Sequence, residues 1–379
     1  MRQPIPLLGL LALAAYLVSG CHKADPGAAH APSGKKAQDA GVLNLFWWAD
    51  FMAPDTIPNF ERQTGIKVRV SYFDTNETLE VRLLTGNSGF DAVDPTASFF
   101  QRQIRSGAYL PLDKSKLPNY KNLNPEIMEK VALNDPNNAH GIVYSWGTYG
   151  IAYNEALLSA TLPGVPLESW RLLFDPAYAS KLAKCGIGTL DSPAPFVRVA
   201  LKYLGRSPNE PTERDLTDVE KMLGIVRPYF RMIDSSSIIE SLANGDICIA
   251  FDSNGDAVQA RNRATEAKNG VKIAFIIPKE GSMLWFDMAG IPRDAPNVEN
   301  AYRFLDYLMD PEVSASFTNH RGFANANAAA TQFQKPAIAT DKVIYPTPDE
   351  QRRLIAPTED PPEQARAITR LWQKFKTGQ

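Results

Sequence analysis

The sequence has few of the residues with which enzymes usually carry out chemistry. Only three cysteines and four histidines occur in 379 residues, and two of the histidines, His22 and His30, lie in a polar segment near the start. No His, Cys or Glu spacing typical of a zinc site is present, and no Gly-x-Ser-x-Gly elbow or phosphate-binding glycine loop precedes a helix. Catalysis is therefore disfavoured, and we expect neither a metal nor a cofactor. A hydrolase that uses only paired carboxylates stays open, because the fold sets such pairs.

An excess of charge of one sign is also missing. The chain has 40 Lys and Arg against 42 Asp and Glu, a formal net charge of −2, and no basic run is interleaved with aromatic residues. Nucleic acid is therefore not an expected partner. At 44 % hydrophobic and 22 % charged residues, the composition is ordinary for a soluble globular protein.

A hydrophobic run occurs at the beginning of the chain and is too short to span a membrane. Arg2 precedes an apolar run over 6–18, and small residues follow, which is the pattern of a secretory signal peptide over residues 1–20. The run ends in LVSGC (17–21), which resembles the lipobox of bacterial lipoproteins. We predict acylation of Cys21, with ordinary cleavage nearby as the alternative. Residues 21–41 are rich in Ala, Gly, Ser, Lys and Pro and are expected to form a flexible tether.

Two cysteines remain in the exported part of the chain. In an oxidising compartment a leftover pair is usually bonded, so we predict a disulfide between Cys185 and Cys248. Spacing alone does not show that the two side chains meet.

The pattern of apolar residues favours an α/β fold in two domains. About 340 residues follow the tether, more than one core usually supports. An apolar run at 43–48 predicts a buried strand, a capping cluster at 54–56 begins a helix that Gly65 ends, and alternation at 66–72 predicts a second strand. Similar signals predict a helix over 238–243, strands over 247–251 and 271–277, and a helix between Asn297 and Pro311.

Several motifs occur in an order that resembles one known family. They are WADFMAPDT (48–56), DPTASF (94–99), YGIAYN (149–154), LANGDIC (242–248), IPKEG (277–281), FD (286–287) and FANAN (323–327). From about residue 43 to the end, the chain resembles the periplasmic polyamine-binding proteins of bacterial ABC importers, and is most similar to the putrescine-binding branch.

The resemblance implies an α/β fold of the two-lobe, type II periplasmic binding protein kind, with a ligand cleft between the lobes. Lobe 1 is expected to comprise 42–148 plus 286–331, and lobe 2 to comprise 149–285 plus 332–379. It also implies a monomeric, non-enzymatic receptor in the periplasm that delivers a cationic amine to a permease in the inner membrane, and that contacts a membrane only through a lipid anchor on Cys21. A sensory module that presents the same ligand to a signalling partner is the alternative.

The family pattern also implies a set of ligand-binding residues suited to a linear diammonium, whose charged ends need carboxylates and whose methylenes need aromatic walls. Carboxylates that carry over are Asp50, Asp256 and Asp287; aromatic walls are Trp48, Trp285 and Phe323; and hydroxyls are Thr96 and Ser98. Each has a structural alternative that stays open. The acids fit turn or strand-end positions, the tryptophans fit a core, and the hydroxyls fit helix caps.

The chain departs from the family pattern at several cleft positions. Pro195 stands where the family has an acidic anchor, Ser253 replaces a tryptophan, and Asp252 replaces a glycine. Ala49, Phe51 and Phe323 each replace a residue with a hydroxyl group. Because Asp252 restores a carboxylate and Ser253 opens space, we hypothesise a modified or longer amine such as spermidine, agmatine or an acylated diamine, and include Asp252 and Ser253 in the predicted site.

Overall fold

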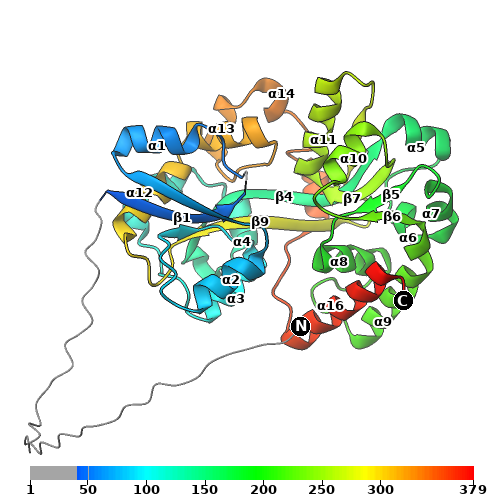
Figure 1. Cartoon of the computed structure of the whole chain (residues 1–379), viewed down its shortest axis with the longest axis horizontal. Coiled ribbons are helices and arrows are strands. Elements are labelled where there is room, and N and C mark those ends of the chain that lie inside the picture. The colour runs from blue at the N-terminus through cyan, green and yellow to red at the C-terminus, as the bar shows by residue number, and fades with distance from the viewer. Residues whose placement is uncertain (1–40, 50) are drawn as a thin grey trace, which may run out of the picture. The chain divides into compact units, whose positions relative to one another are not determined.

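The computed structural model describes residues 41–49 and 51–379, so the predicted signal peptide, Cys21, nearly all of the predicted tether and Asp50 lie outside the described residues (Figure 1). The described strands are β1 (Val42–Trp48), β2 (Lys67–Phe73), β3 (Ala92–Val93), β4 (Gly141–Asn154), β5 (Ile187–Thr189), β6 (Phe230–Ile233), β7 (Ile249–Ser253), β8 (Ile273–Ile276), β9 (Ser282–Gly290) and β10 (Leu354–Ile355).

These ten strands are connected in one mixed sheet. The order is β2-β1-β3-β9-β4-β7-β5-β6, with β10 beside β9 and β8 beside β4. β1 runs parallel to β2 and β3, and β5 runs parallel to β6 and β7, whereas β9 pairs antiparallel with both β3 and β4. Helices connect the parallel strands, so the α/β prediction is confirmed.

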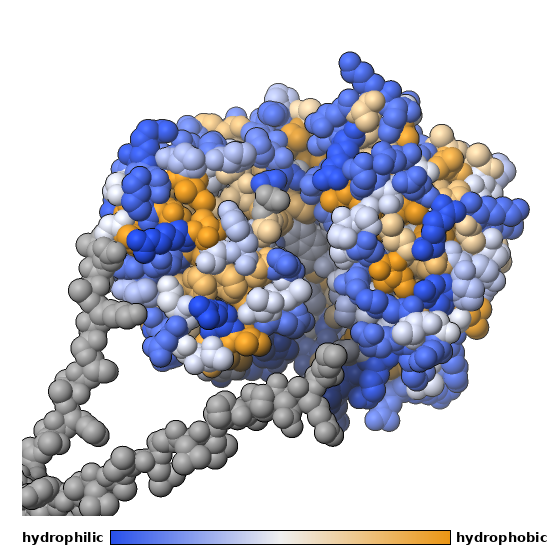
Figure 2. All heavy atoms as spheres, viewed as in Figure 1, coloured by the Kyte–Doolittle hydropathy of each residue, from blue (hydrophilic) through white to orange (hydrophobic). Residues whose placement is uncertain are grey.

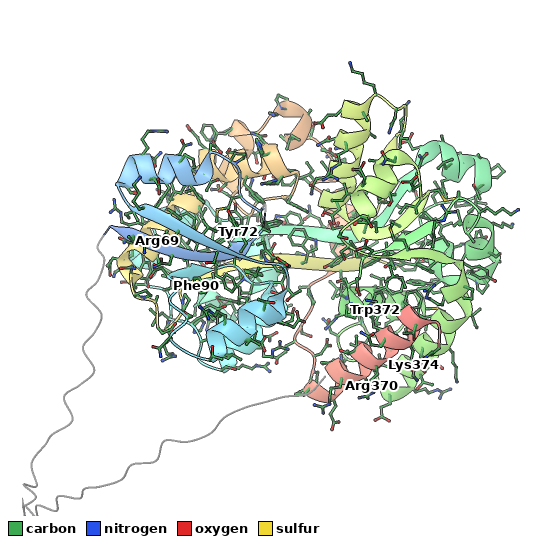
Figure 3. All side chains as sticks on the ribbon, in the orientation of Figure 1. Arg69, Tyr72, Phe90, Arg370, Trp372 and Lys374 are labelled. Atoms are coloured by element: carbon green, nitrogen blue, oxygen red, sulfur yellow. A yellow bond between two sulfur atoms is a disulfide. The ribbon has the colours of Figure 1, made fainter. Side chains whose placement is uncertain are left out.

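The opening strand-helix-strand unit forms as its sequence predicts. The apolar run becomes β1, and α1 (Thr56–Thr64) begins after Asp55. Gly65 ends α1 with a φ of 74°, a left-handed conformation that glycine adopts without a steric penalty. β2 follows at the edge of the sheet and carries Arg69 and Tyr72, labelled in Figure 3. The side chain of Tyr72 is 59 % exposed, although the alternating pattern predicted it on the buried face.

The hydrophobic side chains form two separate clusters, here called core 1 and core 2. Core 1 is covered by helices α1, α2 (Asn76–Leu84), α3 (Ala97–Arg105), α4 (Pro125–Val131), α12 (Val298–Leu308) and α13 (Pro311–Arg321). Core 2 is covered by α5 (Glu155–Thr161), α6 (Arg171–Phe174), α7 (Pro176–Leu182), α8 (Pro193–Tyr203), α9 (Glu213–Val226), α10 (Ile238–Asn244), α11 (Asn254–Ala267) and α16 (Pro362–Thr377). Two short helices, α14 (Pro336–Ala339) and α15 (Pro348–Arg352), precede β10.

Strands β4 and β9 extend from one core to the other (Figure 1). The first part of β4 pairs with β9 and contributes Ile142 and Trp146 to core 1, whereas its second part pairs with β7 and β8 and contributes Ile151 to core 2. Two glycines allow neighbouring rings to lie against β4. A Cβ on Gly147 would lie 2.3 Å from the Trp285 ring, and one on Gly150 would lie 2.3 Å from the Phe275 ring.

A third segment, residues 356–360, is held by side chains from both halves of the molecule. Near core 1, Asn134 donates a hydrogen bond to the carbonyl of Pro357 at 2.9 Å, and Arg105 forms an ion pair with Glu359 at 2.8 Å. Near core 2, Arg198 donates to the carbonyl of Thr358 at 2.9 Å and to Asp360 at 2.7 Å.

The C-terminal helix α16 covers core 2 with one face. Trp372 is buried, and its indole N–H donates to Asp191 at 2.7 Å. Arg370 and Lys374 are exposed on the same helix (Figure 3). In the part of the chain that the structure describes, α16 included, no helix is both long and apolar enough to cross a bilayer.

The predicted disulfide between Cys185 and Cys248 is confirmed. The two Cα atoms lie 5.4 Å apart, and the bond joins the end of α7 to the start of β7 across 63 positions of sequence. The Cys248 N–H also donates to the carbonyl of Gly186 at 3.0 Å, so backbone and disulfide hold the same junction beside core 2.

We expect the double substitution Cys185→Ala and Cys248→Ala to lower the free energy of unfolding by about 2–4 kcal/mol, because the bond restricts the unfolded chain. Urea unfolding without reductant, followed by circular dichroism, measures this difference. Dithiothreitol should lower the unfolding midpoint of the wild type to that of the variant. Equal midpoints for oxidised wild type and variant would contradict the expectation.

Candidate functional site

Most of the sequence-predicted site residues that the structure describes lie near the place where β4 and β9 pass between the two cores. They come from the ends of β1, β3 and β7, from the first turns of α3 and α11, from β9, and from the segment after α13. The carboxyl ends of parallel strands in α/β proteins commonly supply ligand-binding side chains. Figure 2 shows the surface hollowed between the half that contains α1 and α2 and the half that contains α11 and α16.

Asp287 lies at the centre of β9 and is 3 % exposed. Its carboxylate accepts a hydrogen bond from the Ser145 hydroxyl on the facing β4 strand at 2.9 Å. On its other side the backbone bridges Thr96, and Met288 N–H donates to the carbonyl of Pro95 at 2.9 Å. Burial raises the pKa of Asp287 to about 7, against the lowering effect of the Ser145 hydrogen bond.

A second carboxyl, Asp94, lies beside Asp287. Asp94 is completely buried, and neither of its carboxyl oxygens has a hydrogen-bond partner among the described residues. Burial and the neighbouring negative charge of Asp287 raise the pKa of Asp94 well above its ordinary value. Two acids so close together in a buried place cannot both ionise without a compensating cation.

Another acidic pair, Asp252 and Asp256, lies at the junction of β7 and α11. Ser253, between them, accepts a hydrogen bond from the Asp256 N–H at 3.1 Å and so caps α11, while its own N–H donates to Asp252 at 2.8 Å. The second oxygen of Asp252 is buried without a partner in the described part of the chain. Burial, followed by the charge of Asp256, raises the pKa of Asp252 well above its ordinary value, and burial also raises the pKa of Asp256.

Tyr149 on β4 lies near Asp287 and near the Asp252–Asp256 pair. Burial raises the pKa of its hydroxyl, and the charges of Asp287, Asp256 and Asp252 raise it further. Its ring stacks on Phe251, with centroids 5.4 Å apart. The Asp287 and Asp252–Asp256 carboxyls therefore lie near one side chain, although Asp287 and Asp256 are 31 positions apart in the sequence.

Aromatic rings form one wall of the same region. Phe323 lies 5.3 Å from Trp285 in an edge-to-face contact, and 5.3 Å from Phe51. Gly255 leaves room for the Phe323 ring, because a Cβ there would lie 1.7 Å from a ring carbon. The structure thus brings Trp285 and Phe323 together with the first turn of α11, next to Asp256.

The remaining predicted residues are linked less directly to this group. Trp48 packs on Phe73 with centroids 4.4 Å apart, and its indole nitrogen is buried without a partner in the described region. Thr96 is the N-cap residue of α3 but makes no side-chain cap hydrogen bond, and Ser98 is half-buried in the first turn of that helix. Asp50 lies outside the described residues. Pro195 lies in the first turn of α8.

Sequence reasoning did not single out Asp94, Ser145 or Tyr149. Asp94 and Tyr149 fall inside two of the motifs noted above, but only tertiary packing shows that Asp94 is buried and that Tyr149 faces the acids. Ser145 becomes notable only through the register of β4 with β9. For Asp94, the available signal was an acid directly after the buried strand β3.

The site combines negative groups with aromatic surface. The charge of Arg263 lowers the pKa of Asp256, but Arg263 forms its ion pair with Glu240. None of Asp94, Asp252, Asp256 and Asp287 forms an ion pair with a lysine, arginine or histidine of the described chain. Within the same residues no group of three or more His, Cys, Asp or Glu side chains is arranged to hold a metal ion. Such a site is suited to an organic cation.

Comparisons with known proteins agree with this geometry. Residues 56–347 match the family profile described as bacterial extracellular solute-binding protein. The chain is 44 % identical over 344 residues to the putrescine-binding periplasmic protein SpuD of Pseudomonas aeruginosa, with 90 % of this chain and 94 % of SpuD covered. It is also 44 % identical over 347 residues to the putrescine-binding periplasmic protein PotF of Escherichia coli, with 91 % and 94 % covered.

Solved structures show the same fold. The spermidine/putrescine ABC transporter substrate-binding protein PotD of Streptococcus pneumoniae superimposes with a TM-score of 0.77 at 25 % identity, covering 89 % of this chain and 99 % of that one. A putative spermidine/putrescine ABC transporter protein from Listeria monocytogenes gives a TM-score of 0.77 at 29 % identity, covering 89 % and 100 %. The chain belongs to the bacterial extracellular solute-binding proteins, in the group of periplasmic polyamine-binding proteins, and is a solute-binding protein and not an enzyme.

Proposed function

We propose that this protein is the receptor subunit of an ABC importer and binds a linear polyamine of the putrescine type between the two cores. The observation that supports this ligand class is a set of four carboxyls, three of them buried (Asp94, Asp252 and Asp287) and one half-buried (Asp256), which form no ion pair with a cationic side chain of the described chain. Buried carboxylates are stable only when paired or protonated, so a ligand that brings its own positive charges completes this site.

The aromatic wall supports an amine with an apolar middle. Trp285 and Phe323 present ring surface beside Asp256, which suits methylene groups and attracts ammonium groups by cation–π contact. SpuD and PotF are named for putrescine, and a third relative from Pseudomonas aeruginosa, 36 % identical, is a putrescine/agmatine-binding protein. Ser253 and Pro195 stand where the family pattern has an aromatic and an acid, so spermidine, agmatine and acylated diamines belong in any ligand panel beside putrescine.

The two cores suggest how ligand binding is signalled to a permease. We take each core as the centre of one lobe, with β4, β9 and residues 356–360 as the crossings between them. A ligand that contacts Asp287 from one side and Asp256 from the other binds the closed arrangement better than the open one, and so favours closure. The permease in the inner membrane then recognises the closed form.

We expect thermal unfolding of the purified, ligand-free protein to shift upwards with a matching amine. A ligand at a hundredfold excess over its Kd stabilises the folded state by about 2.7 kcal/mol. The panel is putrescine, cadaverine, spermidine, spermine, agmatine, acetylated putrescine and lysine, with 1,4-butanediol as the uncharged analogue. No shift with any amine, from protein shown to be folded and free of ligand, would refute the proposed ligand class.

The carboxyls that bind the amine should be identifiable by substitution. Asp256→Asn and Asp287→Asn are each expected to weaken the best amine by about tenfold to a hundredfold, since each loses a charge-assisted hydrogen bond. Isothermal titration calorimetry measures the change. Asp91→Asn is the matched control, because Asp91 is also fully buried but is already bonded to Asn44 and Asn297. Equal loss in the control and in both site variants would argue against direct contact.

The stability of the ligand-free protein should fall as pH rises because of Asp287. Folding raises the pKa of Asp287 from its ordinary 3.8 to about 7, so the folded protein holds a proton that the unfolded chain releases between these values. This stabilising contribution is fully present below pH 3.8 and is lost as pH rises through 7.

Urea unfolding from pH 4 to pH 8 should therefore show Asp287→Asn gaining stability relative to wild type as the pH rises. The expected gain is on the order of 3–4 kcal/mol, at about 1.4 kcal/mol per pKa unit. A constant difference between the two proteins over this range would show that Asp287 titrates alike in the folded and unfolded states.

We further propose that Cys21 is acylated and holds the mature protein at a membrane, with the following residues as a tether. In the native bacterium, Cys21→Ser should move the protein from the membrane fraction to the soluble periplasmic fraction, as immunoblotting of the two fractions will show. A wild-type protein already found entirely in the soluble fraction would refute the anchor while leaving the receptor function untouched.

A further inference from the structure

The contacts of the Asp94 carboxyl give it no role in stabilising the fold. It is fully buried, and both of its oxygens lack hydrogen-bond partners among the described residues. Burying an unpaired acid costs free energy, so a side chain kept only for packing would be apolar. By contrast Asp91, three residues earlier, accepts hydrogen bonds on both oxygens. The difference points to a partner for Asp94 that comes from outside the chain.

Strand register brings Asp94 to the same face of the sheet as Asp287. Val93 lies opposite Gly290, and Thr96 lies opposite Asp287, so continuous antiparallel register puts Asp94 opposite Ala289. Ala289 and Asp287 are two residues apart and share one face. Diagonal neighbours of this kind have Cα atoms about 7–8 Å apart. The charge of Asp287, which together with burial raises the pKa of Asp94, agrees with this placement.

The groups around this pair supply no positive charge that neutralises it. Tyr109 and Tyr144 face Asp94, Tyr144 and Tyr149 face Asp287, and burial raises the pKa of each phenol, so all three are neutral near pH 7. The charged groups in the second layer include Glu80, which lies near Tyr109 and is ion-paired with Arg102, and Arg321, which lies near Tyr144. Arg321 donates two hydrogen bonds to the carbonyl of Met52, at 2.8 and 3.0 Å.

We propose that Asp94 is a further ligand-binding residue: with Asp287 it forms a two-carboxyl subsite for one protonated amino group, opposite a second such subsite formed by Asp252 and Asp256. This inference rests on the proposed amine-binding function and goes beyond it. In the empty protein each pair holds a proton that reduces the repulsion between its members. The incoming ammonium group replaces that proton as the positive charge, so the proton leaves to the solvent while the amine stays protonated.

Release of protons on binding follows from this arrangement and can be measured directly. Titrating putrescine into the ligand-free protein at pH 7 in phosphate and in Tris, buffers with very different ionisation enthalpies, gives the number of protons released per ligand. For the wild type we expect roughly one proton or more, and an affinity that rises with pH near neutrality.

Three variants test the part played by Asp94. Asp94→Asn keeps the shape of the side chain without its charge and should bind putrescine about tenfold more weakly while releasing fewer protons. Asp94→Val should show the same loss of binding, and the ligand-free variant should melt at a higher temperature than the ligand-free wild type. If Asp94 served only the structure, the variant would melt at a lower temperature. Asp91→Asn, the control, should leave affinity and proton release unchanged. In an Asp287→Asn background the effect of Asp94→Asn should shrink, because the two act as one unit.

The outcomes separate the inference from the proposed function. If the wild type binds no amine of the panel, the proposed function fails. If the wild type binds putrescine and Asp94→Asn or Asp94→Val binds it within twofold, with the same proton release, the proposed function stands and the role of Asp94 is refuted. Having two variants at one position keeps the test decisive if one of them fails to fold.

Discussion

Antiparallel pairing of β4 with β9 is the interaction on which the arrangement of this molecule depends. The two strands carry the sheet from core 1 to core 2, so the hydrogen bonds between them fix how the two hydrophobic clusters are joined. The same register places Ser145 beside Asp287 and Gly147 under the Trp285 ring. A shift of one residue would turn Asp287 and Trp285 to the opposite face and remove both from the site.

The acidic groups near this junction are costly for the empty protein. Elsewhere the chain satisfies its buried acids internally, as with Asp91, and with Asp135, whose carboxylate accepts from the N–H groups of His140 and Gly141 at 2.8 and 3.0 Å. Asp94 has no hydrogen bond on either oxygen within the described chain, and Asp252 has one on a single oxygen, from the Ser253 N–H. The unpaired acids thus make the folded protein less stable than apolar residues at the same positions would. Such a loss of stability is common at binding sites. In the binding mode proposed above, proton uptake limits this cost in the ligand-free protein, and the charge of the ligand offsets it in the bound protein.

Local sequence signals were sufficient for elements whose pattern is complete within a few residues. The apolar run of β1, the glycine stop after α1 and the apolar period between Asn297 and Pro311 all predicted the elements found. They were insufficient for β4, in which Gly147 and Gly150 interrupt any strand pattern, because the reason for these glycines lies in rings from Trp285 and Phe275. Asp94 was missed on the same grounds. Strands distant in the sequence bury Asp94, so the local sequence alone predicts an ordinary loop residue at this position.

Residues 356–360 have a mechanical consequence. Side chains from both halves, Asn134 and Arg105 on one and Arg198 on the other, hold this short segment while β4 and β9 cross beside it. Two crossings alone would leave the halves free to twist about the strand direction as well as to bend. A third attachment away from those strands resists twisting, so one rotation axis remains soft. In the closure proposed above, the two halves would then follow a single path, and every molecule in the closed state would present the same surface to the permease.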